Sequence, residues 1–173
     1  SNDVAAAGPG VFILGFAPGQ AIERVVRHSW QGGARRFAAL VPTSDYGQRA
    51  AQAMFGTVQR LGGTMVGVES YDSAEAARAA ARRLSGRSFD AVLIADAGRV
   101  AVQVGPAGRT GPRILGTELW AATPNLGQTA RLRGSWFAAP PDSRWSQFVQ
   151  RYQARYGRQP ARIATLGYDS VLL

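Results

Sequence analysis

FAALVPTSDYGQRAAQAMFGTVQRLGGTMVGVESY, residues 37–71, is the stretch of this chain that decides its fold. The apolar run over residues 37–41 predicts a buried strand, and a polar loop that carries Tyr46 follows it. A helical pattern over residues 46–61 then ends at a glycine pair. A second strand is expected over residues 64–71. The stretch is therefore a strand–loop–helix–strand unit whose polar loop follows the first strand.

The same alternation continues on both sides of this unit. Further strands are expected over residues 11–16, 89–95, 113–116 and 134–138. An apolar stripe at helical spacing predicts the first helix, with Ile22, Val25, Val26 and Trp30. Later helices are expected over residues 73–84, 97–107, 145–156 and 161–173, and residues 118–127 are expected to form a loop with one helical turn near Pro124. Strands that alternate with helices predict an α/β fold, a parallel sheet with helices on both faces.

A proline pair at Pro140-Pro141 divides the chain. Residues 1–139 are expected to form one α/β lobe, and residues 140–173 a crossover with the terminal helices. The chain has 173 residues, enough for one domain with a substantial core. It lacks an initiator Met and stops within an apolar helical pattern, so it is expected to be part of a longer protein.

Composition narrows the classes of function. The net charge is +9, and every basic residue is an arginine. Two interpretations stay open: an anionic partner, or the arginine bias of a GC-rich genome. The arginines form no stripe with exposed aromatic residues, so no nucleic-acid partner is expected. No apolar run reaches the roughly 18 residues of a membrane span.

Catalysis has few residues available. The chain has no cysteine and no lysine, and His28 is its only histidine. These absences exclude thiol, Schiff-base and phosphate-loop chemistry, and no G-x-S-x-G elbow occurs. Asp90 and Asp96 flank one predicted strand without a third ligand. We therefore expect no enzyme, no cofactor and no metal site.

A binding site is better supported, because three polar loops follow three predicted strands. In parallel sheets such loops converge at the carboxyl ends of the strands. The candidate ligand-binding residues on these loops are Ser44, Tyr46, Asp96, Glu118 and Trp120. Structural alternatives stay open for three of them: Tyr46 packs at the start of its helix, Glu118 pairs with a surface arginine, or Trp120 packs under its own loop.

The chain resembles one lobe of the type I periplasmic binding proteins, the leucine/isoleucine/valine-receptor superfamily. The residues that carry this resemblance are Leu40-Val41, Tyr46-Gly47, Gly62-Gly63, Tyr71-Asp72, Phe148, Tyr152, Tyr156-Gly157, Pro160 and Gly167-Tyr168-Asp169. The resemblance implies a Rossmann-like lobe. It also implies that Tyr46 covers a ligand and that Glu118 pairs with the ammonium group of an amino acid.

The opening residues, with Phe12 to Pro18, are most similar to the branch of penicillin-binding-protein activators. Two functions follow from the resemblance. One is an extracytoplasmic solute receptor that binds an amino acid or peptide between two lobes and delivers it to a transporter permease. The other is a lipid-anchored regulator that docks on a peptidoglycan synthase, its anchor lying outside this chain. Both imply a periplasmic location.

Overall fold

The computed structural model describes residues 8–9, 18–105, 111–123, 125–139, 142–161, 164 and 167. The chain divides into two units, which are described separately: residues 18–139, and residues 1–17 together with 140–173. The predicted strand over residues 11–16 lies outside the described residues, as does most of the predicted helix over residues 161–173. The assignment of residues 1–17 to the first lobe therefore stays a prediction.

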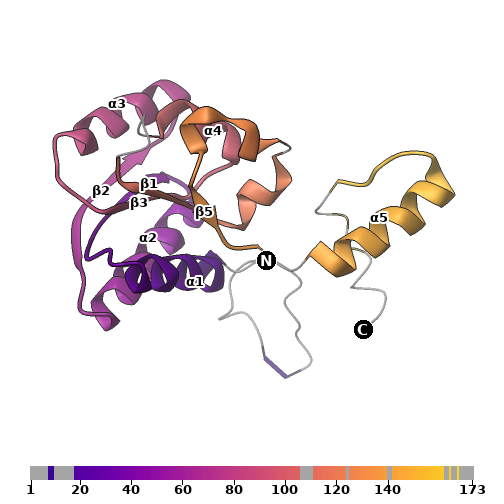
Figure 1. Ribbon diagram of the computed structural model, residues 1–173, viewed down its shortest axis with the longest axis horizontal. Helices are drawn as coiled ribbons and strands as arrows, with labels where there is room; N and C mark the ends of the chain where they lie inside the picture. Colours follow the sequence, from indigo (N-terminus) through magenta and orange to yellow (C-terminus); the bar gives the residue numbers. More distant parts are fainter. Residues whose placement is uncertain are drawn as a thin grey trace. The chain divides into compact units, whose positions relative to one another are not determined.

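A five-stranded parallel sheet forms the centre of the first unit (Figure 1). Its order is β2-β1-β3-β4-β5. The strands are β1 (Arg36–Pro42), β2 (Thr64–Tyr71), β3 (Ala91–Ile94), β4 (Arg113–Gly116) and β5 (Trp136–Phe137). The α/β fold and the parallel sheet predicted from the sequence are confirmed.

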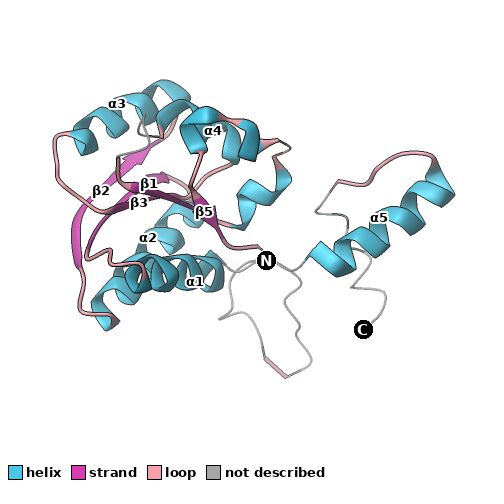
Figure 2. Ribbon diagram, in the orientation of Figure 1, coloured by secondary structure: helices cyan, strands magenta, loops and turns pink. Residues whose placement is uncertain are grey.

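Helices cover both faces of this sheet (Figure 2). The helices are α1 (Pro18–Gln31), α2 (Asp45–Arg60), α3 (Ala74–Ser85) and α4 (Gly98–Val104). Side chains alternate along β1: Phe37 and Ala39 join a core with α1 and α2. Leu40 packs in a second core with α3 and α4. This alternation follows from the two-residue period of a strand, which sends successive side chains to opposite faces.

The start of α2 is fixed by a cap and by a close backbone approach. Ser44 is the N-cap residue, and its Oγ accepts a hydrogen bond of 3.3 Å from the Gly47 backbone N–H. A Cβ at Gly47 would lie 1.8 Å from the Pro42 carbonyl oxygen. Only glycine therefore lets the helix turn directly back onto the end of β1, and this geometry holds Tyr46 above that strand end.

The region after β4 differs from the expectation. Residue 124 itself lies outside the described residues, and the described residues on both sides of it form three short 3₁₀ helices: η2 (Glu118–Ala122), η3 (Leu126–Gln128) and η4 (Ala130–Leu132). Asn125 adopts a left-handed conformation with φ of 60°, which asparagine tolerates better than most residues. The predicted helix over residues 97–107 is described only as far as Val104, which Gly105 follows.

The second unit contains α5 (Asp142–Tyr156), which carries a row of aromatic rings in tilted contact with one another. Ring centroids lie 5.8 Å apart for Trp145 and Phe148, 5.7 Å for Phe148 and Tyr152, and 4.6 Å for Tyr152 and Tyr156. The three- and four-residue spacing places these rings on one side of the helix. Within the described residues, no helix is long and apolar enough to cross a membrane.

Candidate ligand-binding site

The strand order locates a crevice at the carboxyl edge of the sheet. From β1, the chain passes to β2 on one side and later to β3 on the other. Where the strand order reverses in this way, the loops after the two neighbouring strands run in opposite directions and leave a crevice between them. Ligands of open α/β sheets bind in that crevice. Here these are the loops after β1 and β3, which carry Tyr46 and Asp96. The loop after β4, with Glu118, follows at the same edge.

Tyr46 and Glu118 meet at this edge although they come from different loops. The Tyr46 hydroxyl donates to Glu118 Oε1 over 3.0 Å, and it lies 2.8 Å from Thr117 Oγ1. Burial raises the pKa of Tyr46, and the nearby carboxylates of Glu118 and Asp96 add to this effect. Tyr46 therefore stays a neutral donor in the physiological pH range.

Glu118 is a buried carboxylate that is only half satisfied. Its side chain is 7% exposed, and burial raises its pKa above the ordinary value. Among the described residues, two buried side-chain atoms lack a hydrogen-bond partner: Glu118 Oε2 and Trp120 Nε1. A buried polar atom without a partner costs free energy, and Glu118 Oε2 is able to accept a further hydrogen bond. The expected alternative, a surface ion pair with an arginine, is not what this geometry shows.

Tyr71 and Asp96 form a second pair beside the first. The Tyr71 hydroxyl donates to Asp96 Oδ2 over 2.7 Å, and Asp96 Oδ1 accepts from the Ala97 backbone N–H over 2.6 Å. Burial and the Asp96 carboxylate both raise the pKa of Tyr71. The sequence placed Thr117 on the loop after β4 that was expected to reach the site, without a role of its own, and it did not place Tyr71 in the site. Their positions at the ends of β2 and β4 were the available signal.

Two of the predicted site residues have structural tasks. The Ser44 hydroxyl caps α2, so it is already engaged. Trp120 is 2% exposed and packs in the core with α3 and α4. Its indole lies against β4, where a Cβ at Gly116 would be 2.2 Å from the ring. A direct ligand contact stays a prediction for both residues, and the predicted alternative for Trp120, packing under its own loop, matches this burial.

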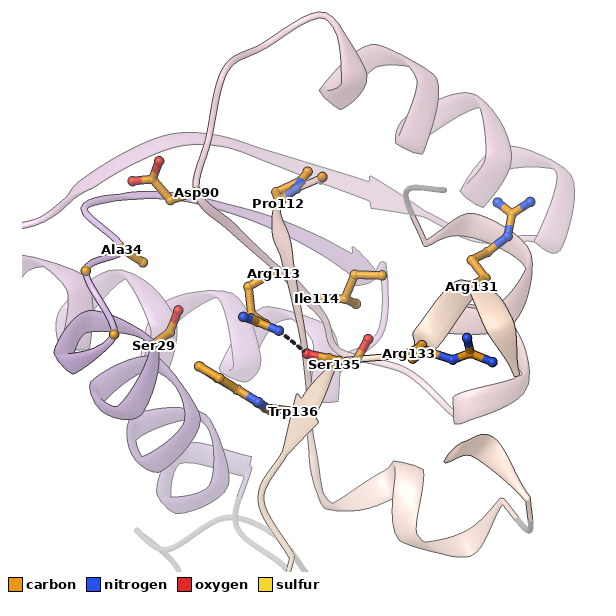
Figure 3. A pocket seen from close by; sticks show the side chains of 14 residues that line it. Ser29, Ala34, Asp90, Pro112, Arg113, Ile114, Arg131, Arg133, Ser135 and Trp136 are labelled. Carbon is orange, nitrogen blue, oxygen red and sulfur yellow. Dashed lines mark hydrogen bonds between the residues drawn. The ribbon is translucent and has the colours of Figure 1, made fainter. Parts of the chain in front are cut away.

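The amino edge of the sheet has a polar cavity of about 340 Å³, lined by Asp90, Arg113 and Trp136 among others (Figure 3). Two of its charged side chains, Asp90 and Arg113, serve the fold. Asp90 Oδ2 accepts the backbone N–H groups of Arg35 and Arg36, each over 2.8 Å. The Arg113 guanidinium donates to the Gly134 carbonyl and lies 4.3 Å from the Trp136 ring centroid. The carboxyl edge is therefore the better candidate site.

No cluster of three or more potential metal ligands occurs in the part of the chain that the structure describes. The two hydrogen-bonded groups at the carboxyl edge bring together two tyrosine hydroxyls, one threonine hydroxyl and two carboxylates. This set of donors and acceptors suits a small polar ligand.

The family described as periplasmic binding protein matches residues 1–173 of this sequence. The chain belongs to this family, whose members are extracytoplasmic, non-enzymatic solute-binding proteins. A search of curated proteins finds no match to the chain.

Solved structures share the fold at low sequence identity. A putative branched-chain amino acid ABC transporter protein from Rhodospirillum rubrum is 22% identical, with a TM-score of 0.71, over 92% of this chain and 49% of that one. LivJ from Streptococcus pneumoniae, in complex with isoleucine, is 21% identical, with a TM-score of 0.62, over 94% and 49%. A solute-binding protein from R. palustris, in complex with benzoate, is 17% identical, with a TM-score of 0.70, over 98% and 49%. The chain therefore spans about half the length of these proteins, which corresponds to one lobe.

Proposed function

We propose that this lobe forms one wall of a two-lobed site that binds a small ligand with an ammonium group, of the amino-acid type, for an ABC transporter. The observation that carries the proposal is the Glu118 carboxylate. It is buried, its Oε1 is held by the Tyr46 hydroxyl, and its Oε2 lacks a partner among the described residues. An ammonium group would satisfy that oxygen with a charge-assisted hydrogen bond.

The charge of the Glu118 carboxylate also bears on the choice between the two classes of ligand that similar structures contain. LivJ from S. pneumoniae holds isoleucine, which has an ammonium group, whereas the R. palustris protein holds benzoate, which has none. A buried carboxylate repels an anion that brings no compensating cation. The charge of Glu118 therefore favours an amino acid over an aromatic acid in this protein.

The remaining residues have supporting roles in this proposal. Tyr46 orients the Glu118 carboxylate and covers one side of the ligand, while the Tyr71–Asp96 pair lines the neighbouring wall. A second lobe, outside this chain, would supply contacts to the ligand carboxylate. Closure of the two lobes about a hinge would then exclude water and strengthen the ion pair.

Calorimetric titration of the full-length protein with amino acids and with benzoate tests the proposal. Amino-acid binding is expected, and Glu118→Gln should weaken it by about 10- to 100-fold, because a hydrogen bond to a charged group contributes roughly 1.5–3 kcal/mol. Glu23→Gln is the matched control, since Glu23 forms only surface ion pairs with Arg27 and Arg60. Equal affinity of Glu118→Gln and the wild type would contradict the role of Glu118.

The second candidate function is a regulator of peptidoglycan synthesis that docks on a synthase, as in the penicillin-binding-protein activators, with a lipid anchor outside this chain. Its support is the set of large apolar side chains that are exposed on the first unit: Phe55 at 54%, Val68 at 45% and Phe137 at 44%. They lie on α2, β2 and β5, and an exposed apolar side chain can take part in a protein-docking contact. A protein that binds no amino acid, but is retained by an immobilised peptidoglycan synthase, would favour this function.

A further inference from the structure

An acidic residue follows each of the strands β1 to β4 at the carboxyl edge of the sheet. These residues are Asp45, Asp72, Asp96 and Glu118, in the order of the strands. The segments that join these strands to the next helices are residues 43–44, 72–73, 95–97 and 117. They all lie within the described residues and contain no arginine. The turns at this edge therefore carry negative charge, in a chain with twenty basic and eleven acidic residues.

The sheet register brings Asp96 and Glu118 to equivalent positions on neighbouring loops. Ile94 of β3 pairs with Gly116 of β4, and each acidic residue follows two positions later. Neighbouring strands lie about 4.8 Å apart. The hydrogen bond from Tyr46 to Glu118 also spans the end of β3, where the loop with Asp96 begins. The two acidic residues therefore belong to one part of the crevice.

Neither of these two carboxylates is neutralised by a basic side chain. Among the described residues, no ion pair includes Asp96 or Glu118. Burial is the main cause that raises the pKa of Tyr46, and the charges of both acidic residues raise it further, so both act on one hydroxyl. Two negative charges that lie close together repel each other, most strongly where water is partly excluded. A ligand with two positive charges would remove that repulsion.

Both carboxylates are able to accept further hydrogen bonds. Glu118 is 7% exposed, and its Oε2 has no partner among the described residues. Asp96 accepts from the Tyr71 hydroxyl and the Ala97 backbone N–H, which leaves about two of its roughly four lone-pair positions. Asp96 is also partly exposed, so a ligand in the crevice reaches it without displacing the core.

We propose that the crevice selects an amino acid with a cationic side chain, of the lysine or ornithine type, whose second positive charge lies at Asp96. The inference rests on the proposed function, which assigns the α-ammonium group to Glu118. A short methylene chain separates the two cationic groups of such an amino acid, and this suits two carboxylates on neighbouring loops. Asp96 is then a specificity-determining residue.

Calorimetry of the full-length protein with lysine, norleucine and glutamate tests the inference. Norleucine keeps an unbranched side chain without the charge, and glutamate reverses the charge. Lysine should bind at least about tenfold more tightly than norleucine, and glutamate should bind most weakly. Equal binding of lysine and norleucine would overturn the inference and leave the proposed function intact. No binding of any of the three would contradict the proposed function, and the inference with it.

Asp96→Asn keeps the shape of the side chain and removes its charge. The ratio of lysine affinity to norleucine affinity should fall about tenfold, with norleucine binding nearly unchanged. Asp72→Asn is the matched control, because it removes the same charge from an exposed position at the same edge, and it should leave the ratio unchanged. An equal loss for both ligands would show a structural role of Asp96 and overturn the inference. An equal fall of the ratio in both variants would also overturn it, since that result indicates a long-range field.

Glu118→Gln separates the two charges of the ligand. Lysine and norleucine both carry an α-ammonium group, so this variant should weaken both and leave their ratio within about threefold of the wild-type ratio. A loss confined to lysine would assign the side-chain charge to Glu118 and would overturn the role of Asp96.

Discussion

The Tyr46 hydroxyl donates to Glu118 Oε1 over 3.0 Å, although the two residues are 72 positions apart in the chain. Tyr46 stands in the first turn of α2 and Glu118 at the start of η2. This hydrogen bond joins the loops after β1 and β4 above the end of β3, which lies between those strands in the sheet. It fixes the orientation of the carboxylate that the proposed function uses.

Tyr46→Phe removes this hydrogen bond. The buried carboxylate of Glu118 then loses the hydroxyl donor at its Oε1. We expect the free energy of unfolding to fall by about 1–3 kcal/mol, and amino-acid affinity to fall with it. Denaturant unfolding and calorimetry measure the two effects. Tyr156→Phe is the control, because that ring is 57% exposed, and a change within about 0.5 kcal/mol is expected there.

The burial of Glu118 makes stability depend on pH. Its pKa in the folded protein is raised above the ordinary value of 4.5, so the folded state keeps this proton at pH values where the unfolded chain has lost it. Stability contributed at Glu118 therefore falls as pH rises from about 4.5 through the raised pKa, and it is constant below that window. Glu118→Gln removes the titrating group.

Unfolding of the wild type and of Glu118→Gln over a series of pH values checks this sign. The free energy of unfolding of Glu118→Gln minus that of the wild type should increase with pH across the window and then level off. A difference that decreases with pH would show that the folded state favours the ionised carboxylate. Amino-acid affinity should increase with pH over the same window, because the ammonium group binds the carboxylate form.

Gly116 lets the indole of Trp120 lie against β4. Gly116→Ala would place a Cβ 2.2 Å from the ring, so the ring and η2 must move. We expect a loss of about 1–3 kcal/mol, as for other overpacked cores, and weaker amino-acid binding because Glu118 moves with η2. Gly127→Ala is the matched control, since a Cβ there meets no atom within 4 Å. Equal stabilities of the two variants would contradict the assigned contact.

Two phenylalanines test the difference between core and surface. Phe37 is fully buried between the sheet and the helices α1 and α2, whereas Phe55 on α2 is 54% exposed. Phe37→Ala should lower the free energy of unfolding by about 3–5 kcal/mol, and Phe55→Ala by well under 1 kcal/mol. Thermal or denaturant unfolding distinguishes them. If Phe55→Ala leaves stability intact but abolishes retention by a peptidoglycan synthase, the docking function gains support.

Much of the fold was predictable because its determinants are local. Local features mark the limits of several elements directly. Apolar runs predict the strands that end at Pro42 and cover residues 113–116, and the glycine pair after Leu61 predicts the end of α2. The segment between Thr117 and Gly134 was less predictable. Its three 3₁₀ helices have no periodic apolar pattern, and only packing of Trp120, Leu126 and Leu132 in the second core defines their course.

The candidate site was predictable in outline and not in detail. Tyr46, Asp96 and Glu118 follow strands, so their presence at one edge could be inferred from the sequence. The contacts between them could not. Tyr71 proved to be the partner of Asp96, and Thr117 and Glu118 the partners of Tyr46, because the order of the strands decides which loops are neighbours.

By itself, the sequence determined the alternation of strands and helices, since the period of apolar residues and the glycine and proline stops act within a few positions. It also determined which loops carry polar groups. Tertiary structure alone decided that Glu118 is buried with one oxygen that has no partner among the described residues, that Trp120 packs in the core, and that arginines of α3 and η4 line one cavity. Those properties depend on which distant segments pack together, and no local pattern encodes that choice.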